Sequence, residues 1–243
     1  YWLHWGPAEQ TEGVRQQMDD NFQHLTDWMV NGGIDFDFIC ESLLPSQCEK
    51  GGAPLQVGKM AYDAVVVPAC ETLRSTTLER LEAFQQGGGR LIFLGDAPKY
   101  ADAKPDPRGA RLFEASEKAA FSREALLRAL EPVRLLDMRN EDGSRTNNLL
   151  HQLRRDGDGL WLFIAHSRDP YNKDITPRQD IRITVQGEYA VRVYDTQTGD
   201  ILPADFEKAN GKTVVHASLY DCDSLLLRLE PGETAKAVKP AAK

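Results

Sequence analysis

Tyr62–Ala97 reads YDAVVVPACETLRSTTLERLEAFQQGGGRLIFLGDA, and this stretch decides the fold of the first part of the chain. A β-branched run, Ala64–Val67, leads through a polar segment into a pattern with helical spacing. Three glycines, Gly87–Gly89, then precede a second apolar run, Leu91–Leu94. Strand, helix and strand in this order form the crossover that makes neighbouring strands parallel. The stretch therefore predicts a parallel sheet.

Composition argues against two classes of partner. The length of 243 residues suits one large domain or two modest ones, and a charged fraction of 27% is ordinary for a globular protein. The net charge of −8 argues against nucleic acid as a partner, because nucleic acid selects basic surfaces. No apolar run approaches the roughly 18 residues of a membrane span. We therefore expect neither nucleic acid nor a membrane as a partner.

The chain begins Tyr1-Trp2-Leu3-His4-Trp5, without an initiator methionine and without a signal peptide. We interpret it as a piece of a longer protein, so the compartment stays open, with the cytoplasm favoured over secretion. The aromatic side chains Trp2, His4 and Trp5 form one candidate site. They are expected to pack against a neighbouring domain; stacking on a sugar ring and burial in a core are the alternatives.

The four cysteines do not have the spacing of a metal site such as C-x-x-C. Buried, small apolar side chains are the simpler interpretation, because free cysteine is often fully buried. The Asp156-Gly157-Asp158-Gly159 segment resembles a calcium loop, but the downstream bidentate glutamate is absent, and a hairpin turn is predicted instead. No metal and no cofactor are expected.

The first part of the chain alternates helices and strands. Apolar residues at helical spacing predict a helix over Glu9–Val30, and Ile34–Ile39 alternates as a strand would. A short helix is expected over Glu41–Gln47, followed later by the strand Ala64–Val67. Further along, Ser122 is expected to cap a helix that ends at Leu130.

The central helix has a capping signature of its own. Ser75 or Thr76 is predicted to cap Thr77–Gln86, with Glu79 reaching back as in a capping box. The Pro-, Lys- and Asp-rich segment Ala97–Arg111 is predicted to be a mobile loop.

Beyond Val133 helical periodicity disappears and short strands separated by turn residues take over. Turn chemistry recurs at Asp156–Gly159, Gln186–Glu188, Thr198–Asp200 and Asn210–Gly211. This pattern predicts an antiparallel β-sandwich. The strands are expected at Val133–Met138, Leu149–Arg154, Leu160–His166, Ile181–Gln186, Tyr189–Tyr194, Val214–Leu219 and Leu225–Leu229.

The predicted fold is thus a three-layer α/β sandwich followed by an antiparallel β-sandwich. The α/β domain is expected over residues 1–132, the β-sandwich over 133–232 and a tail over 233–243.

The first domain resembles the class I glutamine-amidotransferase-like fold, with a flavodoxin-like parallel sheet. The resemblance rests on Tyr62–Pro68, Leu78–Phe84 and Gly87–Gly95. It is to the non-catalytic version found beside the catalytic barrel of large glycoside hydrolases, as in β-galactosidase trimerisation domains. Residues Ile34–Pro45, after the Trp-rich start, look like those of uncharacterised large bacterial glycosidases.

The second domain looks like the small β-sandwich that follows in such enzymes. Leu160–Ser167, Tyr194–Gly199 and Asp223–Leu229 carry this resemblance. An active amidotransferase needs a nucleophile elbow after the strand that ends near Leu94, whereas this chain reads Gly95-Asp96-Ala97-Pro98. Glutaminase chemistry is therefore not implied, and no catalytic residue is assigned.

Asp37 and Glu41 form the second candidate site, because ligands bind outside the carboxyl ends of strands in open α/β sheets. They are placed to line a substrate cleft or an interdomain contact. The alternative is that Glu41 only starts the short helix, where the helix dipole favours an acid. Asp96 follows a strand in the same way, and a turn is the simpler interpretation.

The sequence thus predicts a non-catalytic accessory region of a large glycoside hydrolase. It would support the catalytic barrel of the same parent chain, with a second copy and an oligosaccharide as further partners. One alternative is a carbohydrate-binding module. The other is an autonomous amidotransferase-like hydrolase with Cys70 or Ser42 as its nucleophile.

Overall fold

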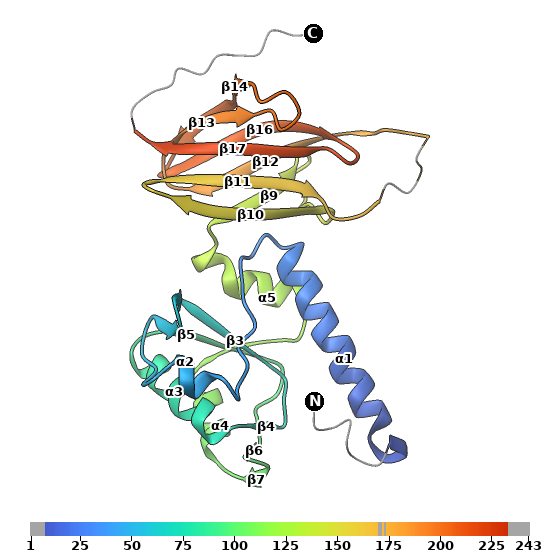
Figure 1. Cartoon of the computed structure of the whole chain (residues 1–243). Helices are drawn as coiled ribbons and strands as arrows, with labels where there is room; N and C mark the ends of the chain where they lie inside the picture. Colours follow the sequence, from blue (N-terminus) through green and yellow to red (C-terminus); the bar gives the residue numbers. More distant parts are fainter. Residues whose placement is uncertain (1–7, 170–171, 173, 233–243) are drawn as a thin grey trace. The chain divides into compact units, whose positions relative to one another are not determined.

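The computed structural model describes residues 8–169, 172 and 174–232, and contacts divide the chain into two units (Figure 1). The described residues of Tyr1–Phe36 and Arg134–Lys243 form the sheet-pair unit, and Asp37–Val133 forms the parallel-sheet unit. The domain bounds at 1–132 and 133–232 stay a prediction, and the tail 233–243 lies outside the described residues.

The strand–helix–strand crossover is confirmed in the parallel-sheet unit. Strand β3 (Ala64–Pro68), helix α3 (Ser75–Gln86) and strand β5 (Arg90–Leu94) follow one another, and β3 pairs with β5 in parallel. Strand β8 (Glu117–Ala119) adds a third parallel strand, giving the order β3-β5-β8. The remaining elements of this unit are α2 (Leu44–Gln47), β1 (Leu55–Val57), β2 (Met60–Tyr62), β4 (Thr72–Leu73), β6 (Tyr100–Ala101), β7 (Lys104–Pro105), α4 (Arg108–Glu114), α5 (Arg123–Leu130) and the 3-10 turn η2 (Glu131–Val133).

Helix α3 packs on β5 through a single apolar cluster. Leu78 and Phe84 of α3 share it with Phe93 of β5, and all three side chains are fully buried. Gly89, immediately before this strand, has to be a glycine because a Cβ there would lie 2.2 Å from the Phe84 ring. Gly88 before it adopts φ +85°, the left-handed conformation that commonly ends helices.

Two expectations for this part of the chain are wrong. Ile34–Ile39 forms no strand, and Phe38 is 56% exposed. The segment runs from one unit into the other at Phe36, so it does not extend either sheet as one strand. Ala97–Arg111, expected to be a mobile loop, forms β6, β7 and the start of α4, because β6 pairs in parallel with β4 and in antiparallel with β7.

In the sheet-pair unit, helix α1 (Ala8–Val30) agrees with the predicted range (Figure 1). Among the described residues, none of the helices is long and apolar enough to cross a membrane. The strands are β9 (Leu136–Asn140), β10 (Leu149–Asp156), β11 (Gly159–His166), β12 (Arg178–Gln186), β13 (Tyr189–Tyr194), β14 (Ile201–Pro203), β15 (Asp205–Ala209), β16 (Lys212–Tyr220) and β17 (Ser224–Pro231).

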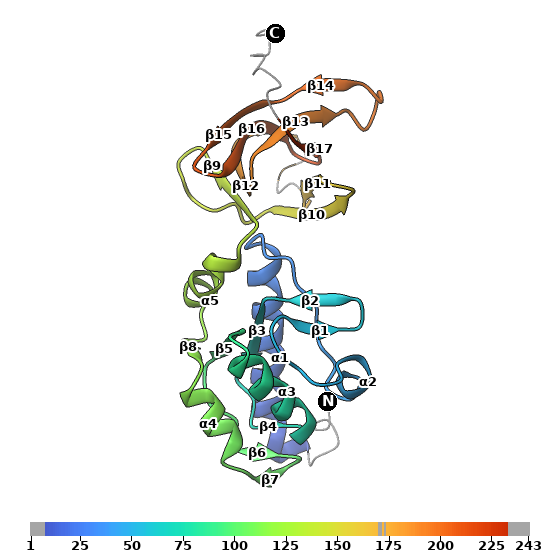
Figure 2. The same ribbon diagram turned by 90° about the vertical axis from the view of Figure 1, so that its left-hand side faces the viewer.

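These strands form two antiparallel sheets, ordered β10-β11-β17-β13-β14 and β15-β16-β12-β9 (Figure 2). One core cluster takes buried side chains from both sheets, among them Leu162 and Leu227 from the first and Ile183 and Val215 from the second. The antiparallel sheets expected beyond Val133 are therefore confirmed, whereas β14 and β15 were not anticipated. The Asp156–Gly159 turn is the predicted hairpin, since Asp156 lies opposite Gly159 across β10 and β11.

Candidate functional site

Asp37 lies in the irregular segment that opens the parallel-sheet unit. Its Oδ2 accepts a hydrogen bond from the hydroxyl of Tyr62, at the end of β2, at 2.6 Å. Tyr62 follows Asp37 by 25 positions, with α2 and most of the β1–β2 hairpin between them, so this bond ties the segment to the hairpin. Asp37 is exposed and retains acceptor capacity beyond this bond.

Glu41 caps a helix, but not the short helix that follows it in the sequence. Its Oε2 accepts the backbone N–H of Arg74 at 2.8 Å, and Arg74 is the N-cap residue of α3. Asp102 supplies a second carboxylate there, with Oδ1 accepting the N–H of Ser75 at 3.1 Å. Negative charge at this end of α3 is favourable, because the first N–H groups of a helix have no intrahelical partners.

This arrangement corrects the predicted capping box. Arg74, not Ser75 or Thr76, is the N-cap, and its side chain makes no capping bond. Two carboxylates from distant parts of the unit satisfy the helix end instead. The hydrogen bonds from Ser75 also hold the pKa of Asp102 below its usual range. The predicted cap of α5 is confirmed, since Ser122 Oγ accepts the N–H of Ala125 at 3.3 Å.

The surroundings of Cys70 favour the protonated form of its thiol. Burial, with a smaller contribution from the charge of Glu41, raises the pKa of Cys70 to about 12. Cys40, in contrast, is exposed, and its Sγ lies 3.1 Å from Ser42 Oγ. Hydrogen bonds from Ser42 lower the pKa of Cys40.

The sequence restricts what these thiols and Ser42 can do. The five histidines occupy positions 4, 24, 151, 166 and 216, so none belongs to Asp37–Val133. A cysteine or serine nucleophile is normally activated by an adjacent base such as histidine. The sequence of the parallel-sheet unit contains no histidine.

Asp96 lies in a bend after β5. Gly95 before it adopts φ +97°, and a Cβ there would lie 2.9 Å from Ala69 Cβ, so the turn needs glycine. Asp96 and Lys99 line an open surface pocket together with Asp106, whose carboxylate is held by Arg108 at 3.0 Å. The bend agrees with the interpretation of Asp96 as a turn residue.

Trp2, His4 and Trp5 lie outside the described residues, and their role stays a prediction. Within residues 8–169, 172 and 174–232, no group of three or more His, Cys, Asp or Glu side chains is arranged to hold a metal ion. A further surface, not anticipated from the sequence, is the outer face of the five-stranded sheet, where Trp161 and Phe163 alternate with buried leucines. That alternation was the available signal.

The sequence matches no known family profile and no curated protein. Its fold is similar to part of a rhamnosidase from Novosphingobium sp. PP1Y, with a TM-score of 0.62 and 17% identity over 88% of this chain and 21% of that one. For α-L-fucosidase isoenzyme 2 from Paenibacillus thiaminolyticus the TM-score is 0.54 and the identity is 10%, over 86% of this chain and 45% of the fucosidase. For a catalytic mutant of a GH42 β-galactosidase from G. stearothermophilus the TM-score is 0.50 and the identity is 11%, over 93% of this chain and 38% of the galactosidase.

This chain therefore spans between about a fifth and less than half of each of these solved chains. At such identities the likeness concerns the fold alone. The matched share of this chain is larger than either of its two units, so the likeness extends over parts of both.

Proposed function

We propose that this chain is a non-catalytic accessory region of a large glycoside hydrolase, where it supports the catalytic barrel. The observation that carries the proposal is the fold likeness to the rhamnosidase, which takes in 88% of this chain but only 21% of that enzyme. The other two neighbours named above are also glycoside hydrolases of which this chain matches a minor part. In this role the chain would pack beside the larger catalytic domain of its parent protein.

The chemistry of the parallel-sheet unit supports the absence of a catalytic role. Cys70, with its pKa of about 12, is protonated at neutral pH, and the thiolate is the reactive form. Glu41 is committed to the end of α3 and Asp37 to Tyr62. Both carboxylates therefore accept hydrogen bonds that stabilise the fold, and these bonds account for their positions.

The parallel-sheet unit is proposed to be a version of the glutamine-amidotransferase-like fold, related to the trimerisation domain of β-galactosidases. The parallel crossover of β3, α3 and β5 supports this assignment. The proposed partners are the catalytic barrel of the same parent chain and a second copy. Asp37 and Glu41 would lie at the interdomain contact, next to the exposed side chains of Phe38 and Leu43.

A hydrolysis assay tests the absence of catalysis. The chain is incubated with nitrophenyl α-L-rhamnoside, α-L-fucoside and β-galactoside, and the expected rate equals that of buffer. Cys70→Ala and Ser42→Ala serve as matched variants. Hydrolysis by the chain that either substitution abolishes would establish the autonomous hydrolase instead.

The accessory role needs a second measurement, because an inactive chain is compatible with other roles. An antibody against the chain is used to identify the natural gene product and its mass. The expected product is much larger than the 27.2 kDa of this chain and hydrolyses at least one glycoside. A natural product of about this mass would refute the proposal.

A further inference from the structure

The outer face of the five-stranded sheet is unusually rich in aromatic residues and arginine. Along β11, Leu160, Leu162 and Ile164 are buried in the core. Successive side chains of a strand point to opposite faces, so Trp161 and Phe163 point away from that core. Phe163 is 39% exposed.

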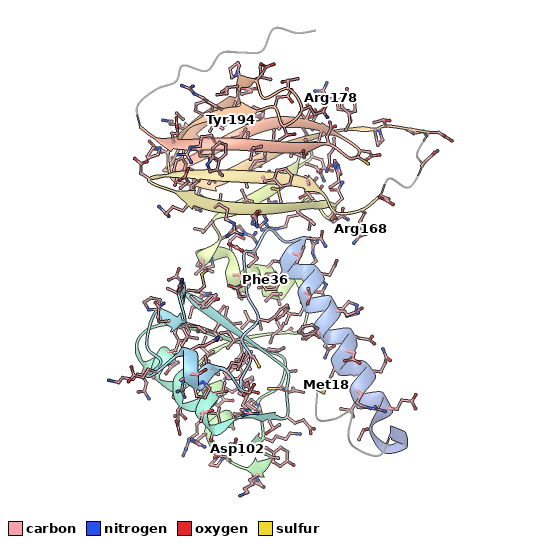
Figure 3. All side chains as sticks on the ribbon, in the orientation of Figure 1. Met18, Phe36, Asp102, Arg168, Arg178 and Tyr194 are labelled. Carbon is pink, nitrogen blue, oxygen red and sulfur yellow. The ribbon has the colours of Figure 1, made fainter. Side chains whose placement is uncertain are left out.

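Strand register extends this face across the sheet. Arg154 on β10 lies opposite Trp161, which lies opposite Arg228 on β17, which lies opposite Arg192 on β13. In the next row Phe163 is level with Tyr194 of β13, across Leu226 (Figure 3 labels Tyr194). We name this surface the arginine–aromatic face; it consists of Arg154, Trp161, Phe163, Arg192, Tyr194 and Arg228.

The centre of the face is fixed by mutual contacts. The Arg228 guanidinium lies 5.0 Å from the centre of the Trp161 ring, and the Tyr194 ring meets Trp161 edge-on at 4.8 Å. Asp156 Oδ2 accepts the Trp161 Nε1–H at 3.2 Å and lies 3.3 Å from Arg228 Nη1. Gly159 makes room for this packing, because a Cβ there would lie 2.8 Å from Arg228 Nη2. The aromatic rings are therefore held in place before any ligand arrives.

The flanks of the face carry positive charge. Arg228 is compensated by Asp156 and by Glu230, whose Oε1 lies 3.6 Å from its Nε. Arg154 and Arg192 are exposed, and no carboxylate of the described residues lies within 4.0 Å of either. In a chain with a net charge of −8, two such arginines on one aromatic surface complement an anion.

We propose that the arginine–aromatic face binds an acidic oligosaccharide, one whose sugar rings carry carboxylates. The planar guanidinium forms paired hydrogen bonds with a carboxylate, and aromatic rings pack on the apolar face of a sugar ring. Three strand spacings separate Arg154 from Arg192, about 14 Å, so an extended oligosaccharide reaches both and a single sugar does not.

A thin, linear ligand fits this surface better than a protein does. A stable protein interface buries about 800 Å² on each partner with an apolar centre, whereas Trp161 and Tyr194 are already half-buried by their own neighbours. The inference does not depend on the proposed accessory role, because binding is a property of the chain itself.

Isothermal titration calorimetry tests the proposal on the chain as it is. The probes are oligomers of galacturonate, glucuronate and mannuronate, with methyl-esterified oligogalacturonate as the uncharged control. At least one acidic series is expected to bind. The methyl ester is expected to bind roughly tenfold more weakly, because hydrogen bonds between charged groups are stronger than those to neutral groups. The affinity is expected to fall as sodium chloride is raised from 50 to 500 mM.

Substitutions locate the binding surface. Arg154→Ala and Arg192→Ala are each expected to weaken binding about tenfold, and their exposure leaves the fold intact, as circular dichroism will verify. Arg182→Ala is the matched control, since Arg182 is an exposed arginine on a strand of the other sheet. Its affinity is expected to equal that of the unmodified chain.

Three results would overturn the proposal. They are equal binding of ester and acid, equal loss in Arg182→Ala and Arg192→Ala, and no binding of any acidic series at millimolar concentration. In the last case, hydrogen exchange slowed at β11 only in the natural parent protein would identify a protein-docking face in its place.

Discussion

Removing the Glu41 carboxylate should destabilise the parallel-sheet unit, although Glu41 is not part of α3, the helix whose end it caps. In Glu41→Ala the N–H of Arg74 loses its acceptor, and the end of α3 loses one negative charge. A lost cap costs about 1 kcal/mol, and the dipole contribution about 0.5 kcal/mol. The expected loss is therefore about 1.5 kcal/mol in the free energy of unfolding of this unit.

The two units can be observed separately. All four tryptophans, at positions 2, 5, 28 and 161, lie outside Asp37–Val133, so tryptophan emission does not report directly on that unit. Cys48 is buried within it and reports its opening through pulsed thiol labelling. With an m-value of about 1.5 kcal/mol per M urea, the Cys48 midpoint should fall by about 1 M, and the tryptophan midpoint should move less.

Glu79→Ala is the decisive control for the origin of the cap. The sequence assigns Glu79 to the capping box, whereas in the structure Glu41 and Asp102 occupy the helix end. Because alanine is a good helix former, Glu79→Ala should leave the Cys48 midpoint within about 0.3 M of the unmodified chain. An equal fall in both variants, or a fall in Glu79→Ala alone, would refute the capping scheme.

Three more predictions concern thiols, pH and packing. Iodoacetamide at pH 8, followed by peptide mass spectrometry, should label Cys40 well before Cys70, because burial raises the pKa of Cys70 to about 12. Burial lowers the pKa of His151 below its unfolded value of about 6.5. The sheet-pair unit should therefore lose stability as pH falls below about 6.5. His151→Gln should reduce the fall in urea midpoint between pH 7.5 and 5.5. Gly89→Ala should lower the Cys48 midpoint through a clash with the Phe84 ring, at a cost of about 1–3 kcal/mol.

Each of these predictions has a clear opposing result. Equal labelling rates would show that Cys70 is accessible and ionised. An unchanged pH slope in His151→Gln would assign the pH dependence to other groups. A Gly89→Ala chain of normal stability would show that the Phe84 ring moves at little cost.

Local patterns predicted the fold wherever one segment sufficed to specify the element. The β-branched run of β3, the glycines after α3 and the Ser122 cap all act within a few residues, and the structure agrees with them. The strand predicted over Ile34–Ile39 is wrong because alternation indicates which faces a segment presents but not whether a partner strand is available. Ile201–Pro203, which forms β14, was missed because its three exposed residues have no alternation to detect.

The candidate site depended on long-range contacts, and these were not predictable from spacing. Glu41 meets Arg74 across 33 positions, and Asp102 meets Ser75 across 27. The spacing of Ser75, Thr76 and Glu79 predicts a local capping box. In the structure, carboxylates from distant parts of the unit accept the N–H groups at this helix end instead. The role of Glu41 at a cleft or interdomain contact stays a prediction, whereas its bond to the start of α3 is visible only in the fold.

The parallel-sheet unit is an insertion within the sheet-pair unit, since the chain leaves the latter at Phe36 and returns at Arg134. Arg134 donates to the carbonyl of Gly32, and Arg168 lies 3.7 Å from Asp27, so the two flanking segments meet in space. When the inserted unit is unfolded, joining them closes a loop of ~100 residues, and the length-dependent entropy cost is about 4 kcal/mol. During synthesis α1 emerges first and its partners last, so folding of the inserted unit before the sheets are complete would bring the two flanking segments together.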